Sequence, residues 1–171
     1  MKRIASLAAP LALAALALSG CSLKPLYVGG GSGAVATTLT RIQVAPIEGK
    51  AGWLMGNALN DRFAAGGATP LYRLEVRLDD KITGLGVRRD NSVAREQRRL
   101  RARYQLIDLA KGTVLLDATA GSDAGIDVVG SEYATIAAEN TALERLSDIV
   151  AEQIVSRVAL YAQRTQASKA P

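Results

Sequence analysis

Two runs of alternating apolar and polar residues constrain the fold of this chain more than any other feature of its sequence. A period of two is typical of a β-strand that buries one face and exposes the other. The apolar positions are Tyr72, Leu74, Val76 and Leu78 in the first run, and Leu100, Ala102, Tyr104 and Leu106 in the second. The charged and polar residues between them are therefore expected to share one exposed face.

The two runs are predicted to pair as one long antiparallel hairpin. Because their apolar faces must match, the numbers of paired residues must add up to an even number. With a turn near residues 90–92, this rule places Asp79 opposite Arg101 or Arg103. The arginines of the second run are expected to pair with acids of the first run or to contact a partner protein: Arg99, Arg101 and Arg103, with Asp79 and Glu75 as the acids.

A short strand and a short helix are predicted before the hairpin. The strand lies at residues 42–44, directly before Pro46. The helix is expected from Trp53 to Ala65, where two following glycines act as a stop signal. Trp53 itself is interpreted as a packing residue rather than a ligand-binding aromatic. The apolar residues of the helix recur at a spacing of four: Met55, Leu59 and Phe63.

A third alternating strand is predicted from Val114, after a turn at residues 108–113. The segment from Gly121 to Gly130 fits neither a strand nor a helix pattern and receives no assignment. Ser131 can cap a long helix that reaches about Arg164, because this segment lacks both glycine and proline. Its apolar stripe recurs at steps of three and four: Leu143, Leu146, Val150, Ile154, Val158 and Tyr161.

The order strand, helix, three strands, helix predicts an α+β fold. We expect a two-layer α/β sandwich, in which a mostly antiparallel sheet of about four strands is covered on one face by two helices. The other sheet face is left exposed. Residues 40–165 are predicted to form this single globular domain, and residues 166–171 a disordered tail.

The first 20 residues have the features of a lipoprotein signal peptide. Lys2 and Arg3 precede an uncharged run over residues 4–18, which is too short to span a membrane. Small residues then lead to Cys21, the only cysteine, which we expect to be acylated and to begin the mature protein. An ordinary secretory signal is the alternative. Residues 21–39, which are rich in glycine, are predicted to form a flexible tether.

The residue types present argue against catalysis. The chain has no histidine, and lipidation of Cys21 leaves no free thiol. The commonest general base, the usual zinc ligands and the cysteine nucleophile are therefore missing together. We expect a protein that is not an enzyme and that has no metal or other cofactor, and a surface-anchored hydrolase is disfavoured.

Positive charge is concentrated in the hairpin. Seven arginines lie between Arg88 and Arg103 against two acidic residues, a net charge of +5, whereas the rest of the mature chain sums to −2. In a cytosolic protein such a segment would indicate nucleic acid. In an exported, lipid-anchored chain, the expected acidic partner is instead a lipid headgroup or another envelope protein.

Residues 21–27, with the sequence Cys-Ser-Leu-Lys-Pro-Leu-Tyr, are similar to the lipidated start of the LPS-assembly lipoprotein family LptE. Ser22 and Leu23 stand where Gly and Phe are commoner in that family. Residues 103–108 resemble its third-strand signature, and residues 131–146 and 154–161 resemble the beginning and the end of its C-terminal helix. The resemblance spans nearly the whole mature chain.

This resemblance implies a lipoprotein of the bacterial outer membrane, held by its lipid on the periplasmic side. It implies a plug for the LPS-translocating barrel LptD, which assists assembly of that barrel and binds LPS, with no role for nucleic acid. Ser22 fits outer-membrane sorting, because the usual retention signal at that position is Asp. The candidate LPS ligands are cations of the hairpin, which can bind lipid phosphates: Lys81, Arg88, Arg89 and Arg95.

One other function combines a lipid anchor with a small α/β domain. The chain would then be the auxiliary lipoprotein of an ABC-type lipid transport system. The partner protein distinguishes the two hypotheses, since the first requires a large outer-membrane barrel and the second an inner-membrane transport complex.

Overall fold

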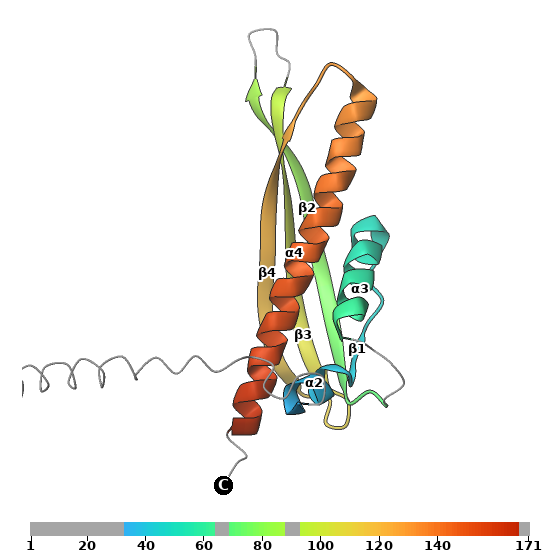
Figure 1. The fold of residues 1–171 in the computed structure, drawn as a ribbon, viewed down its shortest axis with the longest axis vertical. Coiled ribbons are helices and arrows are strands. Elements are labelled where there is room, and N and C mark those ends of the chain that lie inside the picture. The colour runs from blue at the N-terminus through green and yellow to red at the C-terminus, as the bar shows by residue number, and fades with distance from the viewer. Residues whose placement is uncertain (1–32, 64–68, 88–92, 168–171) are drawn as a thin grey trace, which may run out of the picture.

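A computed structural model describes residues 33–63, 69–87 and 93–167 as one four-stranded sheet with three helices (Figure 1). The α+β class and the four-stranded sheet are therefore confirmed. A third, short helix accompanies the two that the sequence predicts. The elements are α2 (Ala34–Leu39), β1 (Ile42–Val44), α3 (Gly49–Phe63), β2 (Tyr72–Val87), β3 (Val93–Asp108), β4 (Val114–Asp127) and α4 (Glu132–Ala167).

The sheet follows the chain order β1-β2-β3-β4. β1 is parallel to β2, and the two other pairs are antiparallel. Asp79 lies opposite Arg101, so the predicted hairpin register is confirmed. This register is favoured because a slip by one residue would turn every apolar side chain of one strand toward water.

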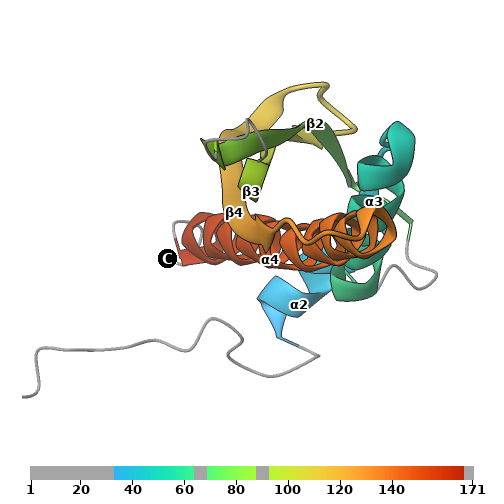
Figure 2. The same cartoon turned by 90° about the horizontal axis from the view of Figure 1, so that it is seen from above.

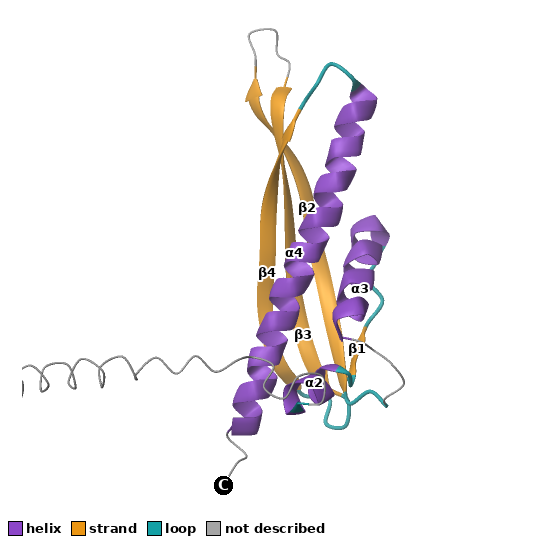
Figure 3. Ribbon diagram, viewed as in Figure 1, coloured by secondary structure: helices purple, strands orange, loops and turns teal. Residues whose placement is uncertain are grey.

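α4 crosses the sheet obliquely and extends along the length of the strands (Figure 3). Seen from above, the curved sheet and α4 enclose the interior, and α3 lies beside α4 (Figure 2). The predicted apolar stripes of strands and helices form the core between these layers. Its fully buried side chains include Leu74, Leu100, Tyr104 and Leu106 from the strands, Met55, Leu59 and Phe63 from α3, and Leu143, Leu146, Val150 and Ile154 from α4.

The described residues begin at Gly33, and residues 34–39 of the predicted flexible tether form the helix α2. α2 packs Val35 and Leu39 into the core, where they are only 7% and 5% exposed. The Nε2 atom of Gln166 donates a hydrogen bond of 2.9 Å to the carbonyl oxygen of Ala34, which ties α2 to the end of α4. Two apolar contacts in a six-residue helix are too few to give a periodic signal in the sequence.

Three other predicted boundaries differ from the structure. α3 begins at Gly49 instead of Trp53. α4 continues to Ala167, so residues 166 and 167, predicted as part of a disordered tail, are helical. The unassigned segment after Gly121 continues β4 to Asp127, because it pairs with β3 along its whole length. Ser131 caps α4 as predicted, its Oγ accepting a hydrogen bond of 3.4 Å from the backbone N–H of Ala134.

The turn before β4 is confirmed in detail. Asp108 Oδ1 accepts hydrogen bonds from the backbone N–H groups of Ala110 and Lys111, at 2.9 and 3.1 Å. Gly112 follows with a φ of 66°, a left-handed conformation that favours glycine. The signal peptide, Cys21, the hairpin turn at residues 90–92 and Gly66–Gly67 lie outside the described residues.

Candidate functional site

The sheet face that no helix covers carries the polar side chains of three strands. This surface, here called the polar face, consists of odd-numbered positions, because side chains alternate along each strand. The expectation of a charged, exposed sheet face is confirmed. Its charged members are Arg73, Glu75, Arg77, Asp79 and Lys81 on β2, Arg95, Arg99, Arg101 and Arg103 on β3, and Asp117, Asp123 and Asp127 on β4.

The arginines that β3 places on the polar face form ion pairs with acids of β4, not with Asp79 and Glu75 of β2. The predicted partners are therefore wrong. Glu75 binds Arg73 of its own strand at 2.9 Å. The pairs between β3 and β4 are Arg95–Asp127 at 3.1 Å, Arg99–Asp123 at 3.1 Å, Arg101–Asp123 at 3.3 Å and Arg103–Asp117 at 3.0 Å.

The strand register explains these partners. Arg95 lies directly opposite Asp127, and Arg99 directly opposite Asp123. Arg101 lies opposite Gly121 and extends over it: a Cβ added at Gly121 would stand 2.5 Å from Arg101 Cδ and 2.9 Å from the carbonyl oxygen of Leu100. The missing side chain thus gives the Arg101 guanidinium room to reach Asp123.

Asp117 is the acid most strongly affected by this network. Hydrogen bonds from Arg103, and then one of 2.8 Å from Gln105 Nε2, hold the pKa of its carboxyl below the usual value. The same contact raises the pKa of the Arg103 guanidinium. Asp117 therefore remains ionised further into mild acid than an isolated aspartate does, and its ion pair with Arg103 persists there.

β2 contributes cations that this network does not neutralise. Arg77 lies opposite Arg103, and Lys81 opposite Arg99, so like charges face each other across the hairpin. Within the described ranges, neither Arg77 nor Lys81 forms an ion pair. A hollow of about 180 Å³ lies at this point, lined by Glu75, Arg77, Arg103 and Gln105. The polar face therefore has a local excess of positive charge along β2.

Two of the predicted LPS ligands can be placed. Lys81 and Arg95 both lie exposed on the polar face, and Arg95 shares its guanidinium with Asp127. Arg88 and Arg89, like Cys21, lie outside the described residues. Sequence reasoning missed the acids of β4 as partners of the β3 arginines. The one available signal was that Asp117, Asp123 and Asp127 all occupy odd positions and so share a face of the strand.

A separate buried cluster joins the hairpin to α4. Arg98, which is only 9% exposed, donates hydrogen bonds to both carboxylate oxygens of Asp80 and to the backbone carbonyl of Glu139 at 2.8 Å. Beside it, burial and the nearby Glu139 carboxyl raise the pKa of Glu96. One carboxylate oxygen of Glu96 is buried without a hydrogen-bond partner. This cluster faces the interior and is not part of the polar face.

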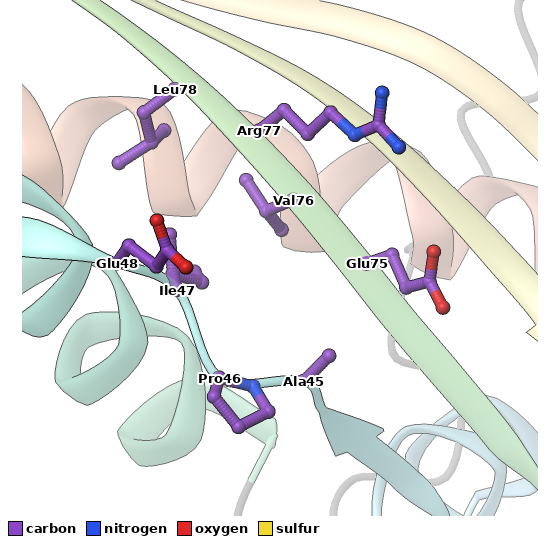
Figure 4. A pocket seen from close by; sticks show the side chains of 8 residues that line it. All are labelled: Ala45, Pro46, Ile47, Glu48, Glu75, Val76, Arg77 and Leu78. Atoms are coloured by element: carbon purple, nitrogen blue, oxygen red, sulfur yellow. The ribbon is translucent and has the colours of Figure 1, made fainter.

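Another hollow lies where the β1–β2 ladder ends, with a volume of about 460 Å³. It is lined by residues 45–48 and 75–78. Figure 4 shows that Glu75 and Arg77 extend from the side of β2 opposite to Val76 and Leu78.

The described part of the chain offers no metal site, since no three acidic, histidine or cysteine residues cluster there. No described helix is both long and apolar enough to cross a membrane. The site residues are instead charged groups on an open sheet face.

Comparison with known proteins identifies one family and several similar structures. The model of the family LptE, described as lipopolysaccharide-assembly, matches residues 39–158. A lipoprotein of Caulobacter crescentus has a similar structure, with 26% identity, a TM-score of 0.65 and coverage of 81% of this chain and 99% of that chain. No curated protein sequence matches the chain.

Two further solved structures share the fold at lower identity. A minor lipoprotein of Acinetobacter baumannii is 15% identical, with a TM-score of 0.57, and the match covers 71% of this chain and 92% of that one. Lipoprotein B of Nitrosomonas europaea is 14% identical, with a TM-score of 0.54 and coverage of 71% and 84%. At these identities the likeness shows the fold alone.

Proposed function

This chain belongs to the LptE family of lipopolysaccharide-assembly proteins, and from that premise we propose that it plugs and helps to assemble an LptD-type outer-membrane barrel. The family match over residues 39–158 is the observation that carries the proposal. The chain acts without catalysis, as a structural and binding partner of the barrel.

The polar face supports a role inside a barrel. The lumen of an outer-membrane barrel is polar and filled with water, whereas its outer wall is apolar. A sheet face with ion pairs along its length can hydrogen-bond to such a lumen without exposing apolar surface. The pairs also hold the arginine side chains of β3 in place, so that less side-chain entropy is lost when the barrel closes around them.

The unneutralised cations of the hairpin support contact with LPS. The phosphates of lipid A and the inner core are bound by guanidinium and ammonium groups. We propose Lys81, Arg88, Arg89 and Arg95 as ligands. Lys81 is exposed without an ion pair among described residues, whereas Arg95 must share its charge with Asp127. Lys81 is therefore the stronger of the two described ligands.

The proposal includes an anchor in the inner leaflet of the outer membrane, through a lipid on Cys21. Eleven residues separate Cys21 from Gly33, where the described body begins. As a flexible chain they would span about 20 Å. That length holds the body close to the leaflet while allowing it to enter a barrel.

Depletion of the chain in its native host tests the assembly role. Without its plug, the barrel is expected to accumulate in an incompletely folded form, seen as loss of its compact species on electrophoresis of unheated samples. Surface LPS should fall in parallel. Normal folding of every outer-membrane barrel after depletion would contradict the proposal.

LPS binding is tested separately on the purified full chain. The substitution Lys81→Glu is expected to weaken binding at least fivefold, and Arg88→Glu with Arg89→Glu more strongly. Arg145→Glu, on the exposed surface of α4, is the matched control. Unchanged affinity in the hairpin variants would remove these residues from the LPS site.

A further inference from the structure

A second charged surface lies on the other side of the molecule, at the seam between the outer edge of β4 and the C-terminal half of α4. Two adjoining hollows of about 390 and 340 Å³ open along it. Both are lined by Arg157 and Leu160. This seam is separate from the polar face, because its cations stand on the helix and not on the strands.

β4 is an edge strand, and its backbone is available along this seam. The backbone N–H of Gly121 donates to Gln153 Oε1 of α4 at 3.1 Å, so it points away from β3. Because hydrogen-bonding direction alternates along a strand, the N–H and carbonyl groups of Asp117 and Thr119 point to the same side. Within the described sheet, no strand pairs with them there. Gln153 occupies only the Gly121 position.

Arg157 and Arg164 provide the charge of the seam. They lie two helical turns apart, about 10 Å along α4. Within the parts of the chain that the structure describes, neither forms an ion pair, in contrast to the arginines of β3. Glu152 is the one acid among the residues that line the two hollows. The seam is therefore complementary to negative charge.

The floor of the seam holds a polar group without a partner. Tyr104, which lines the hollow of about 390 Å³, is 1% exposed, and its hydroxyl makes no hydrogen bond with a described residue. A buried hydroxyl without a partner costs about 1–3 kcal/mol. Leu160, which is 42% exposed, adds apolar surface beside it. An edge strand, unpaired cations, an unsatisfied hydroxyl and an exposed leucine thus meet in one place.

We propose that the seam binds an extended acidic segment of a protein partner, which adds to β4 as a fifth strand and directs its carboxylates toward Arg157 and Arg164. The free N–H and carbonyl groups of β4 can form main-chain hydrogen bonds with a peptide. A lipid headgroup could bind the two arginines but could not form this ladder of backbone hydrogen bonds. Acidic residues two to four positions apart on one side of the segment lie about 7–13 Å apart, within reach of both flexible arginines.

The test uses the purified full chain and the peptide acetyl-(Val-Glu)4-amide, followed by NMR. The backbone amide signals of Asp117 and Thr119 are expected to shift most. The combined variant Arg157→Glu with Arg164→Glu should weaken binding at least tenfold, as should exchange of the peptide for acetyl-(Val-Lys)4-amide. Arg145→Glu, also exposed on α4, should bind as the wild type does.

Two controls distinguish strand addition from simple anion binding. A peptide with N-methyl groups at alternate residues keeps its carboxylates but loses half of its backbone donors, so it should bind at least tenfold more weakly. Sodium phosphate at equal negative charge should not shift the β4 amides. Equal binding of the N-methylated peptide, equal shifts with phosphate, or peptide shifts confined to the polar face would each overturn the proposal.

Discussion

Arg98 of β3 binds Asp80 of β2 through two hydrogen bonds, from Nε to Oδ1 at 2.8 Å and from Nη2 to Oδ2 at 2.5 Å. Its remaining nitrogen, Nη1, donates to the carbonyl of Glu139 on α4. One side chain thus links two strands and the helix, in a place where its charge is largely withdrawn from water.

Replacing Arg98 by leucine should therefore destabilise the fold. The change leaves the Asp80 carboxylate, whose side chain is 23% exposed, without its partner. A loss of about 2–3 kcal/mol in the free energy of unfolding is expected, somewhat less than for a fully buried pair. Urea unfolding of the purified full chain measures it. Arg95→Leu breaks an exposed pair and should cost less than about 1 kcal/mol. Equal losses in the two variants would contradict this role of Arg98.

Glu96 should make the fold less stable as the pH rises. Its native pKa is raised above 4.5 by burial and by Glu139, so the folded state holds its proton more tightly than the unfolded chain does. The resulting stability is complete below about pH 4 and is lost as the pH rises through the native pKa.

Glu96→Gln removes this dependence. The variant should be more stable than the wild type at neutral pH, and the difference should shrink toward pH 4, as measured by urea unfolding across that range. Glu144→Gln, on the exposed surface of α4, provides the control and should leave the pH profile unchanged. A stability difference between Glu96→Gln and the wild type that does not vary with pH would contradict the explanation.

Gly121 should not tolerate a side chain. In Gly121→Ala the new methyl group would collide with the Arg101 side chain and with the backbone of Leu100, at a cost of about 1–3 kcal/mol. Gly125 of the same strand has open space at its Cβ position, so Gly125→Ala is the matched control and should be nearly neutral or slightly stabilising. Adding Arg101→Ala to Gly121→Ala should recover only part of the loss, because the Leu100 carbonyl remains. Full recovery would mean that only the arginine was in the way.

α2 should contribute to stability although it lies in a region that the sequence predicts as a tether. Leu39→Ala removes a buried side chain and is expected to cost about 2–3 kcal/mol. Thr37→Ala, on the exposed side of the same helix, should change the unfolding free energy by less than about 0.5 kcal/mol. A negligible effect of Leu39→Ala would show that the ordered body begins after α2.

The hairpin was predictable in detail because its alternation is strict. With apolar side chains at every second position of both strands, only registers of one parity bury all of them. This rule leaves Arg101 or Arg103 opposite Asp79, and the structure has Arg101. The long helix was predictable for a similar reason, since its apolar stripe is continuous from Leu143 to Tyr161.

The unpredicted parts lack such a signal. β4 continues through Ala120, Gly121 and Ser122, whose small side chains show no clear alternation, and its place is set by pairing with β3. With that segment unassigned, the acids Asp123 and Asp127 could not be matched to arginines. The orphan hydroxyl of Tyr104 depends on three-dimensional packing, which the sequence pattern of a buried aromatic does not contain.

The central claim is that this member of the LptE family acts as the plug of an LptD-type barrel. Its most direct test is extraction of the tagged full chain from its native membranes in mild detergent, with identification of the proteins that co-purify with it. The account predicts one large outer-membrane barrel in equimolar amount. Recovery of an inner-membrane ABC transport complex without any barrel would contradict it.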